Sequence, residues 1–261
     1  MFRSIAIVFS TYSKIPMPIF EWKEEDLRYS MCAFPLVGLV LAALSCGAYR
    51  LMLCLGAGNL LTAGVMTVLP LIFTGGIHMD GYMDTMDALS SYGSREKKLE
   101  ILKDPHIGAF AVIHAVIYTV AELSLWSELA RLDIEGYMGN MLFYLVMAGY
   151  VMSRTLSAAS VLTFKKAKAD GMVSDLSKAQ GTKCRTIIAA VLILLIVLMF
   201  VLYGIYALCT VIPAVSVFLF YRRMSYRSFG GITGDLAGWF LQICELSVLF
   251  TVVMTSMILK L

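Results

Sequence analysis

Residues 74–87 read Thr-Gly-Gly-Ile-His-Met-Asp-Gly-Tyr-Met-Asp-Thr-Met-Asp and directly follow an apolar run of membrane length. If this stretch continues as a helix at about 100° per residue, Asp80, Asp84 and Asp87 fall within an arc of about 60° on one face. No lysine or arginine lies four residues beyond any of them. Three such carboxylates need a cation, and Mg²⁺ suits them because it takes oxygen ligands from few carboxylates and from substrate phosphates. The stretch predicts a site for a phosphorylated substrate at a membrane surface.

The composition indicates the fold class. Hydrophobic residues make up 59% of the 261 residues and charged residues 15%, whereas soluble domains are about a quarter charged. We therefore expect an all-α protein, a polytopic transmembrane helical bundle that forms a single integral membrane catalytic domain over residues 1–261. Each span needs about 20 predominantly apolar residues. Seven stretches are interpreted as spans: 31–53, 57–77, 108–130, 138–162, 186–203, 205–221 and 239–259.

Basic residues divide the polar segments into two groups. The N-terminal arm 1–30 and the loops 78–107, 163–185 and 222–238 hold 17 of the chain's 21 lysines and arginines. The positive-inside rule then predicts seven spans in the inner cell membrane, with the N-terminus and these loops on the cytoplasmic side. Fusing the fifth and sixth spans would move three arginines outside, so we expect them to be separate. The net charge of +3 reflects this bias, and we expect no nucleic-acid partner.

The six cysteines and the N-terminal arm are interpreted as structural. No Cys-x-x-Cys pair is present, so all six cysteines are expected to be small apolar packing residues rather than metal ligands or disulfides. Residues 1–30 contain a short apolar run that soon meets prolines and acidic residues, without a signal-peptide cleavage site. This arm is expected to lie at the membrane interface or to fold into the site.

A second string echoes the first. Residues 75–80 and 230–235 share the pattern Gly-Gly-Ile-x-x-Asp, and both strings stand at a predicted cytoplasmic membrane boundary. Glycine lets backbone N–H groups approach an anion closely. We expect both strings to contribute to one phosphate site, and an internal duplication is the less favoured explanation.

Five other polar residues lie near or inside the predicted spans. His78 could orient a carboxylate, contact a phosphate or accept a proton, or it could simply pack at the interface. Lys103 and Asp104 precede a proline, where Asp104 could cap a helix or share in catalysis. Arg154 lies within a span at a cost of about 2.5 to 3.5 kcal/mol or more, so pairing with a phosphate or with Glu245 is expected.

Taken in order, these strings resemble the adenosylcobinamide-GDP ribazoletransferase family, also called cobalamin synthase. The resemblance covers nearly the whole chain, and the central aspartate string is its most specific part. The carriers are Ser13–Pro18, Phe34–Gly38, His78–Asp87, Lys103–Asp104, Ile107–Phe110, Arg154, Asp170–Gly171, Gly230–Asp235 and Glu245.

The resemblance implies a Mg²⁺-dependent phosphotransfer with adenosylcobinamide-GDP and α-ribazole as substrates. The 5′-hydroxyl of α-ribazole, or of its 5′-phosphate, would attack the cobinamide-linked phosphorus, giving adenosylcobalamin or its phosphate, and GMP. The implied metal ligands are Asp80, Asp84, Asp87 and Asp235. The implied catalytic residues are His78, Asp84, Asp87, Lys103 and Asp104. The implied substrate-binding residues are Gly75, Gly76, Arg154, Gly230, Gly231, Thr233, Gly234 and Glu245.

Two other functions stay open on the residues alone, and the oligomeric state is not decided by them. A CDP-alcohol phosphotransferase of lipid synthesis also places aspartates at membrane helix ends, but its Asp-Gly-x-x-Ala-Arg pattern differs from residues 80–85, Asp-Gly-Tyr-Met-Asp-Thr. A cation-coupled transporter would usually hold its ion near the bilayer midplane. These aspartates lie at a predicted surface, which favours chemistry over transport.

Overall fold

The computed structural model of this protein describes residues 2–18, 23–131, 137–167, 176 and 182–259. Nearly all of these residues lie in helices, and the one β-type contact among them is an isolated bridge between Lys166 and Ile232. The all-α class expected from the composition is therefore confirmed.

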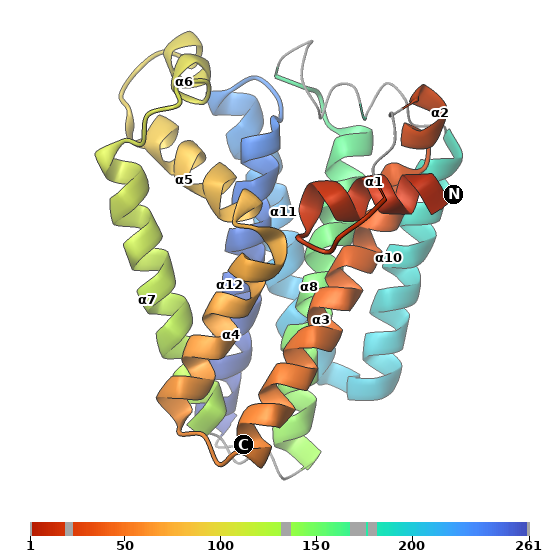
Figure 1. The fold of residues 1–261 in the computed structure, drawn as a ribbon, viewed down its shortest axis with the longest axis vertical. Helices are drawn as coiled ribbons and strands as arrows, with labels where there is room; N and C mark the ends of the chain where they lie inside the picture. Colours follow the sequence, from red (N-terminus) through yellow and green to blue (C-terminus); the bar gives the residue numbers. More distant parts are fainter. Residues whose placement is uncertain (1, 19–22, 132–136, 168–175, 177–181, 260–261) are drawn as a thin grey trace.

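Seven long helices run along the long axis of the molecule (Figure 1). Within the described ranges, five helical stretches could cross a membrane by length and hydropathy, or six if a bent helix pair counts as one span. The chain is thus built as a multi-pass membrane protein. The long helices are α3 (Ser30–Cys54), α4 (Asn59–Thr74), α7 (Ala109–Arg131), α8 (Tyr137–Thr163), α10 (Thr182–Tyr203), α11 (Leu208–Ser228) and α12 (Gly234–Leu259).

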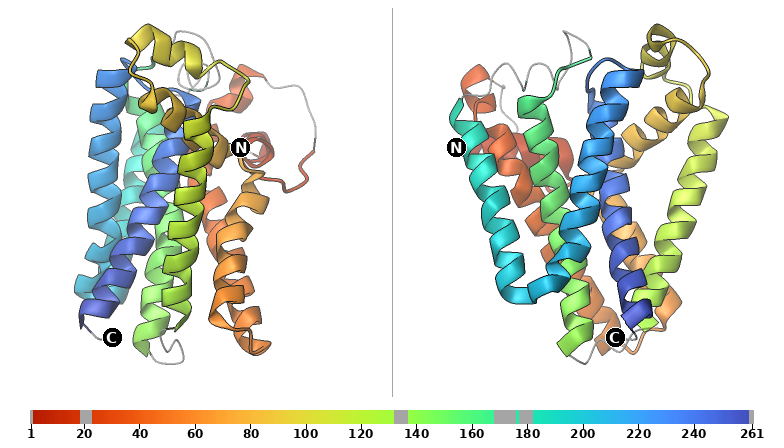
Figure 2. Two further views of the ribbon diagram at one scale, coloured as in Figure 1. Left: turned by 90° about the vertical axis from the view of Figure 1, so that its left-hand side faces the viewer. Right: turned by 180° about the vertical axis from the view of Figure 1, so that it is seen from behind.

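The apolar run from 182 to 228 folds into two helices, as expected from the charges. Helix α10 ends at Tyr203, the short 3-10 helix η1 (Gly204–Ala207) follows, and α11 returns toward the end from which α10 came (Figure 2). Gly204 has φ +56°, a left-handed conformation that glycine adopts without strain. The predicted division near Gly204 is therefore confirmed.

The second predicted span, 57–77, is shorter than expected. Helix α4 ends at Thr74, and after a bend of 94° the chain continues as α5 (Ile77–Ser90). Gly75 and Gly76 form the bend with φ of +65° and +79°. Since residues with a Cβ rarely adopt this conformation, the glycine pair explains why the helix stops here.

Helices α8 and α12 form the centre of the bundle. Helix α8 packs against α3, α10, α11 and α12, whereas α12 also packs against α5 and α7. The contact of α3 with α8 depends on Gly38, because a Cβ there would collide with the carbonyl of Tyr150 and lie 2.9 Å from Cδ of Arg154. Small residues that let helix backbones approach in this way are typical of membrane helix interfaces.

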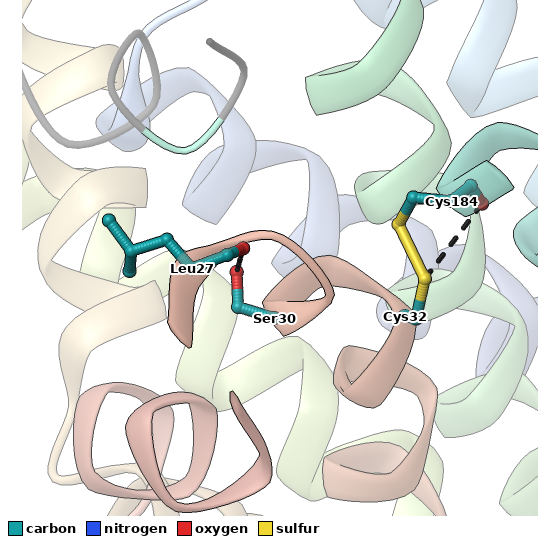
Figure 3. The surroundings of a disulfide bond; sticks show 4 residues. All are labelled: Leu27, Ser30, Cys32 and Cys184. Atoms are coloured by element: carbon teal, nitrogen blue, oxygen red, sulfur yellow. Dashed lines mark hydrogen bonds between the residues drawn. A yellow bond between two sulfur atoms is a disulfide. The ribbon is translucent and has the colours of Figure 1, made fainter. Parts of the chain in front are cut away.

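The cysteine prediction was wrong for one pair. A disulfide joins Cys32, near the start of α3, to Cys184, near the start of α10, and their Cα atoms are 6.0 Å apart (Figure 3). This pairing could not be predicted from the sequence, because the two cysteines are 152 residues apart and only the tertiary fold brings the two helix starts together. The other four cysteines are free.

The short helices gather at one end of the bundle (Figure 1). They are α1 (Phe2–Tyr12), α2 (Glu24–Leu27) and α6 (Arg95–Ile101). The α11–α12 connection lies at the same end, as does the end of α5, and we call this the aspartate end. All four segments predicted to share one side of the membrane contribute described residues to this end.

Candidate active site

Helices α5 and α12 meet through two glycines, and this contact brings the two Gly-Gly-Ile-x-x-Asp strings together. A Cβ at Gly81 would lie 2.8 Å from the carbonyl oxygen of Asp235, and a Cβ at Gly238 would lie 3.0 Å from that of His78. Neither position leaves room for a side chain. The prediction that both strings contribute to one site is thus supported by their packing.

Four carboxylates gather at this contact. Asp80, Asp84 and Asp87 lie on one face of α5, as the spacing predicts, and Asp235 lies in the first turn of α12. The charges of the other three all act on Asp84, which is itself half-buried. Among the described residues, none of the three α5 aspartates forms an ion pair.

The carboxylates do not form a ready-made metal cage. Within the described ranges, no group of three or more His, Cys, Asp or Glu side chains is arranged to hold a metal ion. The straight helix α5 explains why its carboxylates lie apart, because a separation of four residues corresponds to about 6 Å along the helix axis. The donor set still fits Mg²⁺, which commonly uses one or two carboxylates and completes its shell with water and phosphate. Magnesium binding stays a prediction.

In the segment before α7, Gly108 lies against an aspartate of α5. A Cβ at Gly108 would collide with the carboxylate of Asp87. Lys103 and Asp104 are exposed, and the Asp104 carboxylate accepts hydrogen bonds from the backbone N–H of His106 at 3.0 Å and from its Nδ1 at 2.7 Å. These bonds, chiefly the one from the backbone, lower the pKa of Asp104. Asp104 does not cap α7, which begins only at Ala109.

The second string is held by a neighbouring loop. The N–H of Ile232 donates to the carbonyl of Lys165 at 2.8 Å, and the carbonyl of Ile232 accepts from Ala167 at 2.9 Å. Thr233 then caps α12, since its Oγ1 accepts from the N–H of Leu236 at 3.3 Å and donates to the Asp235 carboxylate at 3.2 Å. Thr233 therefore orients an aspartate of the cluster.

The structure places His78 away from the aspartates. About 200° of helix rotation separates it from Asp80, so the two side chains leave opposite faces of α5. The His78 ring is buried, with ring centroids 5.9 Å from Tyr12 and 6.2 Å from Phe34. Its Nε2 is buried and has no hydrogen-bond partner among the described residues. His78 thus packs under the N-terminal arm.

Arg154 and Glu245 form the buried ion pair that one prediction anticipated. The guanidinium of Arg154 contacts the Glu245 carboxylate, and only 1% of the Arg154 side chain is exposed. Ser153 donates a further hydrogen bond to Glu245 at 2.9 Å. The pair links α8 to α12 inside the bundle. Substrate binding by Arg154 and Glu245 stays a prediction.

Two cations that were not among the predicted site residues lie against the first glycines of the two strings. The N–H of Lys14 donates to the carbonyl of Phe73 at 2.7 Å, and the Lys14 side chain crosses Gly75. The guanidinium of Arg95 lies against Gly230. The arm that precedes α3 therefore does fold onto the site. Asp170 and Gly171, part of the resemblance, lie outside the described residues.

Fold and site together define a class: a multi-pass helical membrane protein with an acidic, glycine-rich site where two helix starts meet at one end of the bundle. The acids come from α5 and α12, and glycines provide the close contacts around them.

Comparison with known proteins identifies the family. The family model described as cobalamin-5-phosphate synthase matches residues 4–253. The chain therefore belongs to the cobalamin-5-phosphate synthase family. No solved structure matches the chain.

Curated relatives share a single name, adenosylcobinamide-GDP ribazoletransferase. One from Lachnoclostridium phytofermentans is 38% identical over 97% of this chain and 94% of its own length. One from Desulfitobacterium hafniense is 34% identical over 93% of this chain and 92% of its own length. One from Clostridium botulinum is 29% identical over 96% of this chain and 97% of its own length. The resemblance drawn from the sequence strings is confirmed, and the family assignment favours it over the CDP-alcohol and transporter alternatives.

Proposed function

We propose that this protein transfers the adenosylcobinamide phosphate moiety of adenosylcobinamide-GDP to α-ribazole or to its 5′-phosphate. The products are adenosylcobalamin or its phosphate, and GMP, which completes assembly of the nucleotide loop. The observation that carries the proposal is the cluster of Asp80, Asp84, Asp87 and Asp235 at the contact of α5 with α12. The family assignment and the names of the relatives support the same reaction.

The bond changes define what the site must do. A ribose hydroxyl of the nucleophile forms a bond to the cobinamide-linked phosphorus, while the bond from that phosphorus to the bridging oxygen breaks. GMP leaves with the bridging oxygen, and the hydroxyl proton passes to a base. In α-ribazole 5′-phosphate the 5′-oxygen is already esterified, so another ribose hydroxyl must attack. The expectation of a 5′-hydroxyl nucleophile holds at most for unphosphorylated α-ribazole.

We assign the base to a carboxylate of α5 rather than to His78. Asp84 is half-buried among three other carboxylates, and Asp87 faces the backbone at Gly108. His78 leaves the other face of the helix. A substrate hydroxyl bound at the cluster would meet Asp84 or Asp87 first, and either could accept its proton.

The predicted cofactor is Mg²⁺, with Asp80, Asp84, Asp87 and Asp235 as its candidate ligands. When bound, such an ion would neutralise diphosphate oxygens and lower the pKa of a coordinated hydroxyl. The carboxylates of this chain would hold it at the helix contact, and Thr233 would keep Asp235 oriented.

We further propose that the aspartate end faces the cytoplasm from the inner cell membrane. In sequence, the segments 1–30, 78–107, 163–185 and 222–238 hold 17 of the chain's 21 lysines and arginines, and their described residues contribute to this end. An excess of basic residues on the cytoplasmic side is the general rule for membrane proteins.

A direct assay tests the reaction. Membranes that contain the protein are incubated with adenosylcobinamide-GDP, Mg²⁺ and either nucleophile, and the corrinoid product and GMP are separated by chromatography. Equal amounts of both products are expected, with none when Mg²⁺ is chelated. Release of GMP without a new corrinoid, or consumption of CDP-diacylglycerol instead, would overturn the proposal.

A further inference from the structure

Two basic side chains lie against the left-handed first glycines of the two strings. Lys14, just after α1, crosses Gly75, which immediately precedes the glycine at the start of α5, and Gly75 has φ +65°. Arg95, the first residue of α6, rests against Gly230, which has φ +77°. At both glycines a Cβ would collide with the basic side chain. The lack of a Cβ at each glycine thus leaves room for the cation beside it.

Neither cation is neutralised by the protein in the described part of the chain. Lys14 and Arg95 are exposed, and neither forms an ion pair there. Two neighbouring basic residues do have protein partners, since Arg3 pairs with Asp26 and Lys97 pairs with Glu100. Arg95 also stands in the first turn of α6, where the helix dipole disfavours a cation. Helix stability therefore does not account for its position.

The glycine beside each cation occupies the same position in its string. Gly75 precedes Asp80 by the same interval in the chain as Gly230 precedes Asp235, since each pair belongs to one copy of the repeated string. Lys14 lies at Gly75, which precedes α5, and Arg95 begins α6, which follows α5 and contacts it. The acids of α5 lie between them, so a substrate at the acids has a cation on either side.

The reaction proposed above supplies two phosphate groups besides the reacting one. One belongs to the departing GMP, and the other is the 5′-phosphate of α-ribazole 5′-phosphate. In phosphoryl transfer the attacking and leaving oxygens lie roughly in line, on opposite sides of the reacting phosphorus. The two additional phosphates must then approach the carboxylate cluster from opposite sides.

We propose that Lys14 and Arg95 form two separate phosphate-binding positions, one for each reactant. One cation binds the phosphate that leaves with GMP, and the other binds the 5′-phosphate of the nucleophile. The inference rests on the proposed function. Lysine acts here as a point charge, whereas arginine can bind two phosphate oxygens at once.

Steady-state kinetics of Lys14→Met and Arg95→Met test the proposal. For each variant, KM is measured for adenosylcobinamide-GDP, for α-ribazole 5′-phosphate and for unphosphorylated α-ribazole. One variant is expected to raise KM for α-ribazole 5′-phosphate by about 10-fold to 100-fold, as for loss of a charged hydrogen bond, without changing KM for α-ribazole. The other is expected to raise KM for adenosylcobinamide-GDP with either nucleophile.

Matched control variants distinguish the loss of a positive charge from a defect in folding. Arg3→Met and Lys97→Met remove neighbouring cations that already have protein partners, and their KM values should match the wild type. Lys14→Arg and Arg95→Lys should recover most of the lost affinity. As a second readout, GMP should raise the thermal unfolding temperature of the wild type and of one methionine variant but not of the other.

Two outcomes overturn the inference. If KM is the same in both methionine variants as in the wild type, neither cation binds a phosphate. If KM rises for the same single reactant in both variants, the two cations share one phosphate-binding position. A wild-type protein that makes no corrinoid product would instead refute the proposed function, whereas the GMP stabilisation would still report on the cations.

Discussion

The strings 75–80 and 230–235 share four identical residues but fold differently. In the first, both glycines are left-handed and α5 begins at once with Ile77. In the second, only Gly230 is left-handed, Ile232 pairs with Lys166, and α12 begins at Gly234. What the two strings share is a left-handed first glycine under a cation and an aspartate in the first turn of a helix. The sequence pattern therefore specifies where the charges lie rather than one local backbone conformation.

The surroundings of the second glycine account for the difference. A Cβ at Gly76 would meet nothing within 4 Å, so the chain is free to turn there. Gly231 instead presses against the backbone of Lys165 and Lys166, which keeps the next residues extended. Tertiary contacts, rather than the local amino-acid sequence, determine where each helix begins.

Removing a carboxylate at the meeting point of the two strings should have the largest effect. Asp84→Asn is expected to lower kcat by at least about 10²-fold, because several kcal/mol of charge stabilisation at the phosphates depend on the cluster. The measurement is GMP release from membranes with equal amounts of inserted protein. Glu100→Gln, an exposed acid on α6, is the control and should turn over normally. Normal turnover by Asp84→Asn would exclude Asp84 from the site.

Separating the two strings should have the next largest effect. Gly81→Ala would place a Cβ 2.8 Å from the carbonyl oxygen of Asp235 and push α12 from α5. Overpacking of this kind costs about 1–3 kcal/mol, and we expect a loss of activity of about tenfold together with a lower unfolding temperature. Gly64→Ala, where the added Cβ meets nothing within 4 Å, should leave activity unchanged. If both variants behave alike, the close contact is not needed.

Alanine substitutions at two left-handed glycines should distinguish the effect of backbone strain from the effect of a displaced cation. Gly230→Ala and Gly204→Ala should each destabilise the fold by about 1–2 kcal/mol in thermal unfolding, since alanine is strained at positive φ. Only Gly230→Ala also displaces Arg95, so it alone should raise KM, by several-fold. A KM increase in Gly204→Ala would mean that strain, rather than the displaced cation, causes the change.

The loop that holds the second string should show a small effect of pH on stability. Burial, followed by the charge of Arg185, lowers the pKa of Lys166 from 10.5 to about 8. Between about pH 8 and pH 10.5 the folded protein therefore binds fewer protons at Lys166 than the unfolded chain, and stability should rise with pH. Thermal unfolding at several pH values measures this rise, which Lys166→Met should reduce. An unchanged slope in that variant would assign the effect to another group.

The sequence allowed the long helices to be predicted well, because a membrane span demands a long apolar run. The division near Gly204 and the helical face of the α5 aspartates also followed from local rules. The pairing of Arg154 with Glu245 was one of two predicted outcomes, since a charge inside a span needs a partner. These features depend on residues close in sequence or on the cost of burying charge.

Features that depend on distant contacts could not be predicted. The 94° bend follows a glycine pair that would also suit a helix end, and the Cys32–Cys184 disulfide has no local signature. Lys14 and Arg95 stand in ordinary charged segments, and only the fold carries them to Gly75 and Gly230. The orientation of His78 is different, because the helical periodicity that groups the aspartates on one face also turns the His78 ring away from them, so this feature followed from local geometry.

The path of the chain has a practical consequence for orientation. Helix α1 lies at the aspartate end, whereas the last turn of α12 lies at the opposite end (Figure 1). Reporter domains fused at the two termini would therefore occupy different compartments, and a fluorescent protein at one terminus and a periplasmic enzyme at the other should both be active. Swapping the two reporters should silence both.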